Sequence, residues 1–349
     1  MPPPFRIGVM QLTMEPLEEM LASARVMDEA GVDTIWLAEA CPWWRKHGME
    51  ARSSTVVSAL MARETERLAI GWGIISPFTR HPVQVAMDAR VVQEAAGPDR
   101  FLLGFGTSKI FLNNAGLATK KTLGPMREAV EIVRGVLGGN AFEYQGETFS
   151  ASVPALSAEA DSPRGAPALY IAATAPKMQK LAAEIADGLL TPSITTPEYV
   201  RWTLGNVREA GRDPGTIDIG CTVIASIDAS DRAAGRDGAR EIGGMYLANK
   251  FQNIKGAADA LLDCAEIEME ELAPVAQAME QGGRLAAKEA VTDSLLDRCK
   301  PIAGTPEDCI AAIAEYRDAG CTHVMLELWG ADRHEQIRLF GEKVLPEFR

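Results

Sequence analysis

Short apolar runs alternate along the chain with longer segments in which apolar residues recur every three or four positions. Runs of about 4–8 apolar residues are typical of buried strands, and the longer periodic segments are typical of amphipathic helices. The pattern predicts strands at residues 7–12, 34–40, 68–75, 101–106, 168–173, 189–192, 217–227 and 323–328. It predicts helices at residues 17–30, 54–65, 82–96, 125–137, 176–186 and 197–210.

Strands that alternate with helices are expected to run parallel, because each crossover helix returns the chain to the same end of the sheet. Eight such strands predict a closed (β/α)₈ barrel, the TIM-barrel fold. Residues 139–167, after the fourth strand, and residues 228–304, between the seventh and eighth strands, exceed what a minimal barrel needs. We interpret both as insertions into a single domain that spans residues 1–349. A separate helical domain is the alternative for the second segment.

The composition narrows the classes of function. The chain has 349 residues, of which 47% are hydrophobic, so it can bury a large core. Its formal net charge of −13 disfavours nucleic acids and anionic membranes as partners, because both are bound by basic patches. The sequence contains no run of about 18 apolar residues, so no membrane span is predicted. Its first residues lack the basic segment, apolar helix and small-residue cleavage site of a signal peptide. These features predict a cytoplasmic protein.

The six cysteines and four histidines form no known ligand pattern. The cysteines never form a C-x-x-C pair, and the histidines form neither H-x-H nor H-E-x-x-H. We therefore expect free thiols and no metal site. Two carboxylates that end strands, Glu39 and Glu327, are the one feature in favour of a metal-dependent hydrolase.

Residues 69–82, which read AIGWGIISPFTRHP, carry the most informative motif of the chain. This segment resembles the third strand and following loop of the luciferase-like superfamily. The closest branch includes the coenzyme F420-dependent methylenetetrahydromethanopterin reductases, whose pattern is G-x-G-V-x-N-P-x-x-R-H-P; here Ser76 replaces the asparagine. Further segments are similar to other blocks of that family in the same order, namely residues 36–39, 100–106, 127–134, 170–178 and 186–188.

The resemblance implies that a flavin or deazaflavin ring lies over the barrel mouth, where the strands end. In the family, a non-proline cis peptide in the third strand forms a bulge that supports the ring. Its position here is Gly73–Ile74, followed by Ile75 and Ser76. Gly73 would let the backbone approach the ring closely. The alternative is an ordinary core strand with a glycine that serves packing.

Two turns at the same end of the barrel are expected to bind the phosphate of the cofactor. Gly106 and Thr107 follow the fourth strand. Ala173 and Thr174 lead into a helix whose first turn contains Lys177. The N-terminus of a helix offers unpaired amides and the positive end of a dipole. The alternative for Lys177 is a solvated side chain on a turn.

Glu39 ends the second strand beside the expected ring. It is a candidate acid or base, or it makes a structural hydrogen bond to a neighbouring strand. Arg80 either contacts an anionic cofactor tail or pairs with a carboxylate. Trp43 and Trp44 are expected to line the substrate pocket by stacking; loop packing or a dimer contact is the alternative. The related sugar-phosphate dehydrogenases have a histidine where this chain has Ala40, so their proton-abstraction scheme does not transfer.

The resemblance implies an oxidoreductase in which F420 passes hydride to or from a small organic substrate. The alternative is a monooxygenase that uses flavin mononucleotide (FMN), with the reduced cofactor supplied by a partner reductase. A flavin-binding protein without catalytic activity is a third reading. Relatives are usually homodimers that associate through the second and third helices.

Overall fold

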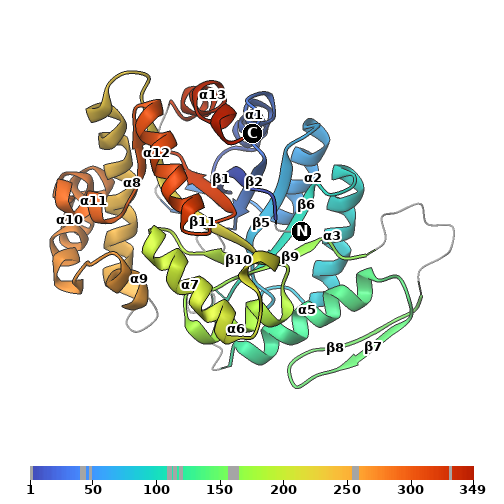
Figure 1. Ribbon diagram of the computed structural model, residues 1–349. Coiled ribbons are helices and arrows are strands. Elements are labelled where there is room, and N and C mark those ends of the chain that lie inside the picture. Colours follow the sequence, from blue (N-terminus) through green and yellow to red (C-terminus); the bar gives the residue numbers. More distant parts are fainter. Residues whose placement is uncertain are drawn as a thin grey trace.

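The computed structural model describes residues 3–39, 45–46, 49–107, 112, 116–117, 121–155, 165–253, 259–329 and 332–349. Eight parallel strands form a closed barrel in the order β10–β9–β6–β5–β2–β1–β13–β11, and β10 pairs with β11 to close it (Figure 1). Their bounds are β1 Arg6–Leu12, β2 Thr34–Ala38, β5 Ala69–Ile75, β6 Phe101–Phe105, β9 Ala168–Ala172, β10 Gly188–Thr191, β11 Asp218–Ile227 and β13 His323–Glu327. The predicted (β/α)₈ barrel is confirmed.

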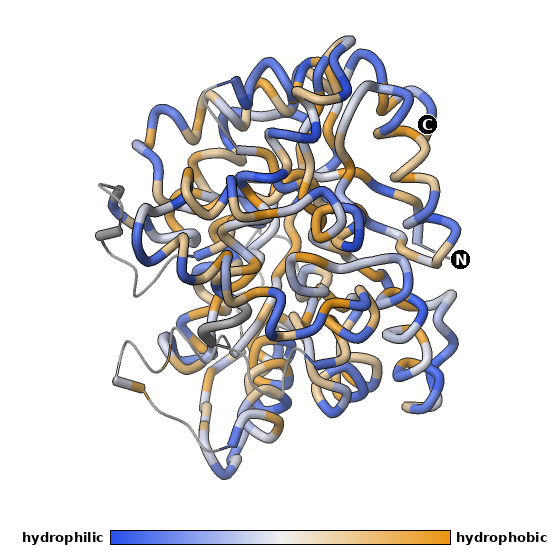
Figure 2. The backbone as a smooth tube through the Cα atoms, turned by 90° about the vertical axis from the view of Figure 1, so that its left-hand side faces the viewer, coloured by the Kyte–Doolittle hydropathy of each residue, from blue (hydrophilic) through white to orange (hydrophobic). Residues whose placement is uncertain are grey.

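Helices cover the outside of the barrel. They are α1 Leu17–Glu29, α2 Ser54–Glu64, α3 Pro82–Ala96, α5 Leu123–Leu137, α6 Pro176–Ile185, α7 Pro197–Glu209, α12 Pro306–Asp318 and α13 Arg333–Lys343. Most of the core lies between these helices and the outward-facing side chains of the strands. Hydrophobic stretches accordingly concentrate toward the centre of the molecule (Figure 2).

The two segments beyond a minimal barrel lie on opposite sides of it in Figure 1. The first forms an antiparallel hairpin of β7 Phe142–Gln145 and β8 Ser150–Val153. The second contains helices and a short strand: α8 Arg232–Asn253, α9 Asp259–Cys264, α10 Ala273–Ala290, α11 Asp293–Arg298 and β12 Ile302–Gly304. The strand β12 was not predicted. It pairs with the far end of β11, which is longer than the other barrel strands and leaves an edge for it.

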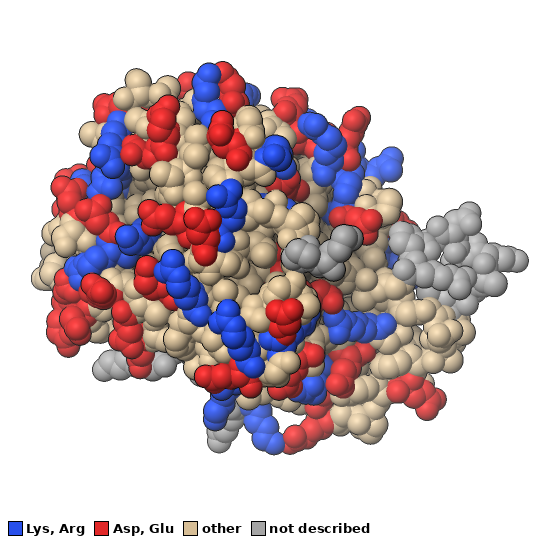
Figure 3. All heavy atoms as spheres, viewed as in Figure 1, with Lys and Arg blue, Asp and Glu red and all other residues tan. Residues whose placement is uncertain are grey.

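Short pieces complete the chain. They are the strands β3 Arg45–Lys46 and β4 Met49–Glu50 and the 3₁₀ turns η1 Pro214–Thr216, η2 Met269–Leu272 and η3 Leu345–Phe348. Acidic and basic side chains are interspersed over the face seen in Figure 3. None of the helices in the described ranges is long and apolar enough to cross a bilayer.

Large side chains fill the barrel where neighbouring strands carry glycines. The rings of Trp36 and Tyr170 meet edge to face with their centroids 5.0 Å apart. A Cβ atom on Gly71 would lie 2.5 Å from the Trp36 ring, and one on Gly188 would lie 2.1 Å from the Tyr170 ring. Both distances are far shorter than van der Waals contact, so these glycines make the room that the two aromatic rings occupy.

The floor of the barrel is a buried polar network built from the first residues of β1, β2, β11 and β13 together with Tyr170 of β9. Arg6 pairs with the carboxylate of Asp218, and Arg6 Nη2 also donates to the Tyr170 hydroxyl at 2.8 Å. The Tyr170 hydroxyl in turn donates to Asp218 Oδ2 at 2.6 Å. His323 Nδ1 lies 3.6 Å from the same carboxylate, and His323 Nε2 lies 2.7 Å from Thr34 Oγ1.

Burial alone would raise the pKa of Asp218. The hydrogen bond and charge of His323, followed by the charge of Arg6, outweigh burial and hold this pKa below its ordinary value of 3.8. Burial lowers the pKa of His323. A carboxylate with a lowered folded pKa contributes stability above the unfolded value and loses it as the pH falls through the folded value. The network therefore stabilises the fold fully at neutral pH.

We expect Asp218→Asn to lower the free energy of unfolding at pH 7 by about 3 kcal/mol, because it leaves the Arg6 guanidinium without its charge partner inside the barrel. Asp297→Asn is the matched control, since that carboxylate is 60% exposed and pairs with Arg236 at the surface. It should change stability by less than about 1 kcal/mol. Denaturant unfolding measures both, and equal effects would contradict a stabilising role of the floor.

Candidate functional site at the barrel mouth

The carboxyl ends of the barrel strands are less buried than the rest of the strands. Among inward-facing positions there, Met10, Ala38, Ile74 and Ala172 are partly exposed, whereas Trp36, one layer below, is fully buried. Met10, Ile74 and Ala172 pack on the cluster formed by Trp36 and its neighbours inside the barrel. The mouth is therefore lined by apolar side chains that pack on a buried layer containing the Trp36 ring.

A bulge in β5 shapes one wall of the mouth. Trp72 pairs with Leu103 and Ile75 with Phe105, so β5 carries one residue more than β6 between these points. The Gly73–Ile74 peptide in the bulge is cis, at the predicted position. A Cβ atom on Gly106 would lie 2.6 Å from Ile74 Cγ1. The bulged side chain thus rests against the bare backbone of the neighbouring strand end.

The residues that follow the bulge shape the loop behind it. Ile75 is fully buried in the outer core, and its carbonyl accepts from the Gly106 amide at 3.0 Å. Ser76 is also buried, and its carbonyl accepts from the Thr79 hydroxyl at 2.9 Å. Only backbone of Ile75 is therefore near the mouth. Thr107, just after β6, is partly exposed.

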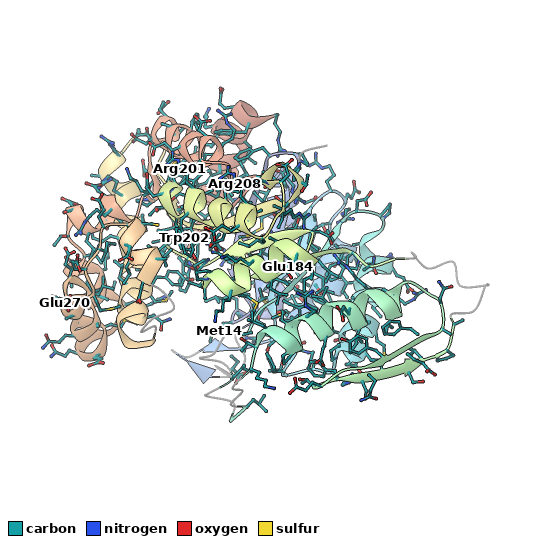
Figure 4. All side chains as sticks on the ribbon, turned by 60° about the horizontal axis from the view of Figure 1, so that its bottom comes forward. Met14, Glu184, Arg201, Trp202, Arg208 and Glu270 are labelled. Carbon is teal, nitrogen blue, oxygen red and sulfur yellow. The ribbon has the colours of Figure 1, made fainter. Side chains whose placement is uncertain are left out.

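Two side chains that sequence reasoning did not identify as part of the site hold the turn after β9 in place by hydrogen bonds to its carbonyls. Gln179 Nε2 donates to the Ala173 carbonyl at 3.3 Å, and the Tyr199 hydroxyl donates to the Thr174 carbonyl at 2.9 Å. The Tyr199 ring lies 5.1 Å from that of Trp202, which is labelled on α7 in Figure 4. Burial raises the pKa of Tyr199, so its hydroxyl keeps the proton that it donates.

These contacts fix the backbone that leads into α6. Pro176 and Lys177 form the first turn of this helix, and Lys177 is exposed. The Ala173 amide donates to the Leu190 carbonyl at 3.0 Å, which anchors the start of the turn to β10. Pro176 has no amide hydrogen, and the Met178 amide donates to the Ala175 carbonyl at 3.0 Å, so the amide that the first turn of the helix offers to a ligand is that of Lys177. The arrangement can hold an anion at the same end of the barrel as the β5 bulge.

Glu39 follows β2 and forms a buried ion pair with Arg80. Arg80 Nη1 and Nη2 each donate to one oxygen of the Glu39 carboxylate at 2.6 Å. The side chain of Glu39 is 7% exposed and that of Arg80 is 21% exposed. Arg80 Nη2 also lies 3.4 Å from Ser53 Oγ, just before α2. The pair therefore joins the end of β2 to the loop after β5. This contact is the structural role that the sequence allowed for both residues: a hydrogen bond from Glu39 to a neighbouring strand region and a carboxylate partner for Arg80.

A second carboxylate, Glu327, ends β13 and is 1% exposed. The Tyr246 hydroxyl from α8 donates to Glu327 Oε1, and Ser193 Oγ, just after β10, donates to Oε2 at 3.2 Å. Burial, then the charge and hydrogen bond of Glu327, raise the pKa of Tyr246 well above its ordinary value. Sequence reasoning did not bring these three residues together.

Several predicted positions lie outside the described residues. They are Trp43 and Trp44, predicted to line the substrate pocket, and the neighbouring Ala40. Across the described ranges, no group of three or more His, Cys, Asp and Glu side chains is arranged to hold a metal ion. One surface hollow, lined by Arg236, Arg240 and acidic residues of α8 and α11, belongs to the outer face of the helical insertion, where those side chains pair with one another.

Known proteins resemble this chain along nearly its whole length. The luciferase-like monooxygenase family matches residues 3–323. A 5,10-methylenetetrahydromethanopterin reductase from Methanolobus tindarius is 25% identical, over 97% of this chain and 99% of the relative. An F420-dependent glucose-6-phosphate dehydrogenase from Nakamurella multipartita is 26% identical, over 100% and 98%. The solved coenzyme F420-dependent tetrahydromethanopterin reductase from Methanopyrus kandleri superposes with a TM-score of 0.84 at 23% identity, over 99% and 100%.

We expect Arg80→Met to lower the free energy of unfolding by about 3 kcal/mol, because the buried Glu39 carboxylate loses its bidentate partner. Arg25→Met is the control. Arg25 pairs with Glu64 at the surface, where both side chains are more than 40% exposed (42% and 44%), and its loss should cost less than about 1 kcal/mol. Denaturant unfolding compares the two variants. An Arg80→Met variant as stable as the control would show that the pair does not hold the loop.

Proposed function

The chain belongs to the luciferase-like monooxygenase family, and we propose that it is an oxidoreductase that uses coenzyme F420 to transfer hydride to or from a small organic substrate at the barrel mouth. The β5 bulge carries this proposal. It presents Ile74 as a partly exposed apolar surface beside side-chain-free Gly106, which fits one face of a flat tricyclic ring. The full-length relatives that act with F420 or on a reduced pterin support the choice of cofactor.

The residues around the mouth are suited to the parts of such a cofactor. Gly73, Ile74 and the backbone of Ile75 and Ser76 would support the ring. Gly106 and Thr107, after β6, lie beside the bulge. When bound, the deazaflavin supplies a carbon that accepts or donates hydride. The apolar lining formed by Met10, Ile74 and Ala172 would exclude water from that carbon.

The anionic tail of the cofactor would lie at the turn after β9. Thr174 and Lys177 would offer backbone amides, and the Lys177 side chain adds a positive charge there, whereas the Ala173 amide already donates to Leu190. Because Gln179 and Tyr199 fix the two carbonyls from the opposite side, the turn needs little rearrangement to receive a phosphate. Glu39 was predicted as an acid or base. We infer instead a positioning role through Arg80, and the direct role stays a prediction.

We infer a single domain for the whole chain. The apolar cluster of the helical insertion includes Ile224 of β11 and Ile194 of the loop after β10, together with Leu247, Leu296 and their neighbours from the inserted helices. α8 packs directly on β11 and β12. An insertion that shares its core with β11 and with the loop after β10 is expected to fold with the barrel.

Titration of the apo-protein with F420 and, separately, with FMN tests the proposed cofactor through ligand fluorescence. We expect F420 to bind at least about ten-fold more tightly than FMN, which corresponds to about 1.4 kcal/mol. Tighter binding of FMN than of F420 would instead favour a flavin-dependent monooxygenase, and a partner reductase would then be the next protein to identify.

Gly106→Ala tests the site of binding. Its Cβ atom would displace Ile74 from the bulge, so F420 affinity should fall about ten-fold or more, or about 1.4 kcal/mol. Gly124→Ala is the control, because a Cβ atom on Gly124 meets nothing within 4 Å. Circular dichroism confirms that both variants are folded. Equal F420 affinity in the two folded variants would contradict a ring seated on the bulge.

We infer that two copies of the chain associate through α2 and α3, as the resemblance suggested. These adjacent helices expose one apolar pair each at i,i+4 spacing: Val56 and Leu60, which are 62% and 41% exposed, and Met87 and Val91, which are 57% and 56% exposed. Residues at this spacing share a helix face. The helices pack on each other, so the two pairs form an apolar surface of the kind that dimers bury.

Sedimentation analysis tests the dimer. The wild type should sediment as a dimer, and Val91→Glu should shift it to a monomer, because a dimer would bury the new charges. Leu285→Glu on α10 places a charge on another exposed apolar residue, 68% exposed, and should leave the dimer intact. A Val91→Glu protein that remains dimeric would place the interface elsewhere.

A further inference from the structure

We propose that Tyr199 and Gln179, oriented by Asn206, are positioning residues that set the affinity of the turn after β9 for a phosphate group. The inference rests on the proposed function and deepens it, because it assigns the phosphate affinity to three buried side chains that do not touch the ligand. They act through the backbone of the turn, whose carbonyls they hold.

The three side chains form a relay of hydrogen bonds that runs from α7 through α6 to the turn. Asn206 Nδ2 donates to Gln179 Oε1 at 2.8 Å. Gln179 Nε2 donates to the Tyr199 hydroxyl oxygen at 3.1 Å. The Tyr199 hydroxyl then donates to the Thr174 carbonyl at 2.9 Å, while Gln179 Nε2 also reaches the Ala173 carbonyl at 3.3 Å. The relay therefore ends on two consecutive carbonyls of the turn.

The acceptors at both ends of the relay fix the direction of its hydrogen bonds. A carbonyl can only accept, so the Gln179 nitrogen and the Tyr199 hydroxyl hydrogen have to face the turn. The Gln179 oxygen then faces Asn206, which supplies the matching amide nitrogen. The same nitrogen of Asn206 lies 3.5 Å from the carbonyl oxygen of Trp202, a further acceptor. Asn206 thus determines which way round the Gln179 amide is held.

These polar groups lie between two helices whose other buried positions are apolar. Gln179 and Tyr199 are fully buried, and Asn206 is 7% exposed. Leu181 of α6 and Val207 of α7 belong to the apolar core around them. Buried polar groups cost free energy unless they are hydrogen-bonded, and a satisfied network holds one arrangement rigidly. Such a network is expected where the backbone has to keep a single conformation.

By holding two carbonyls, the relay also fixes the direction of two amides. In a planar trans peptide, the N–H of one residue points opposite to the C=O of the residue before it. The Ala173 and Thr174 carbonyls point toward α6 and α7, which cover the outside of the barrel (Figure 1). The amides of Thr174 and Ala175 therefore point away from both helices, on the side of the mouth. Within the described part of the chain, neither amide donates to another group.

Two consecutive amides with the same direction form a pair of donors for phosphate oxygens. A phosphate that meets donors already in place loses little interaction energy to ordering them. Without the Tyr199 hydroxyl or the Gln179 amide, the peptide would rotate more freely, and its N–H would spend less time facing the ligand. The effect is expected only for ligands that carry a phosphate, because the ring lies at the β5 bulge.

The alternative is that the relay only satisfies two buried carbonyls and stabilises the fold. A purely structural relay would affect all ligands alike. The two roles can be separated because each candidate cofactor has a counterpart without the phosphate. For F420 this counterpart is the deazaflavin chromophore without its tail, and for FMN it is riboflavin.

Titrations of these four ligands test the proposal in Tyr199→Phe, which removes one hydroxyl, and in Gln179→Met, which keeps the length of the side chain. We expect each variant to bind the cofactor that the wild type prefers about ten-fold more weakly, and its phosphate-free counterpart within about two-fold of wild type. Asn206→Leu should show the same selective loss to a smaller degree, because Gln179 remains but is no longer oriented.

Tyr144→Phe is the matched control. It removes a hydroxyl that donates to Glu131 at 2.7 Å beside the surface hairpin, and it should bind all four ligands as the wild type does. Equal losses for ligands with and without phosphate, or no loss for either, would overturn the positioning role of Tyr199 and Gln179.

Inorganic phosphate separates this inference from the proposed function. In amide NMR spectra of the apo-protein, phosphate should shift the signals of Thr174 and Ala175, and Tyr199→Phe should need about ten-fold more phosphate for the same shift. A wild type that binds no F420 would overturn the proposed function, while the phosphate titration would still test the relay. Equal shifts at equal phosphate concentrations in wild type and Tyr199→Phe would overturn the relay.

Discussion

The contact between Ile74 and the bare backbone of Gly106 is the constraint on which the rest of the site depends. β5 carries one residue more than β6, and that residue can rise at the barrel mouth only because the neighbouring strand ends in a glycine. Any side chain at position 106 would overlap Ile74. Below this contact, glycines again make the room for Trp36 and Tyr170. The barrel thus alternates bare backbone with large rings, and its uppermost apolar layer is left open to a ligand.

Two carboxylates at this mouth have different surroundings. Glu39 is neutralised by a guanidinium and ties the end of β2 to the loop after β5. Glu327 meets hydroxyls from a loop and from the helical insertion. The charged network at the opposite end of the barrel, centred on Asp218, stabilises the floor. The charged groups at the floor stabilise the barrel. The carboxylates at the mouth surround the partly exposed apolar surface there.

The fold was largely readable from the sequence, because buried parallel strands and amphipathic helices leave strong periodic signals. The strand bounds differ from those predicted by at most two residues, and the bulge lies where the resemblance put it. The strand β12 was missed because a strand of three residues is too short to show a recognisable hydrophobic pattern. The support of the β9 turn by Tyr199 and the meeting of Tyr246 with Glu327 join residues far apart in the chain. No local pattern encodes such contacts, so only the folded structure could reveal them.

A crystal structure of the protein with oxidised F420 bound would test the central claim most directly. We expect the deazaflavin ring to lie on Ile74 and beside Gly106, with its phosphate at the turn that contains Thr174. A ring bound away from the β5 bulge would contradict the account.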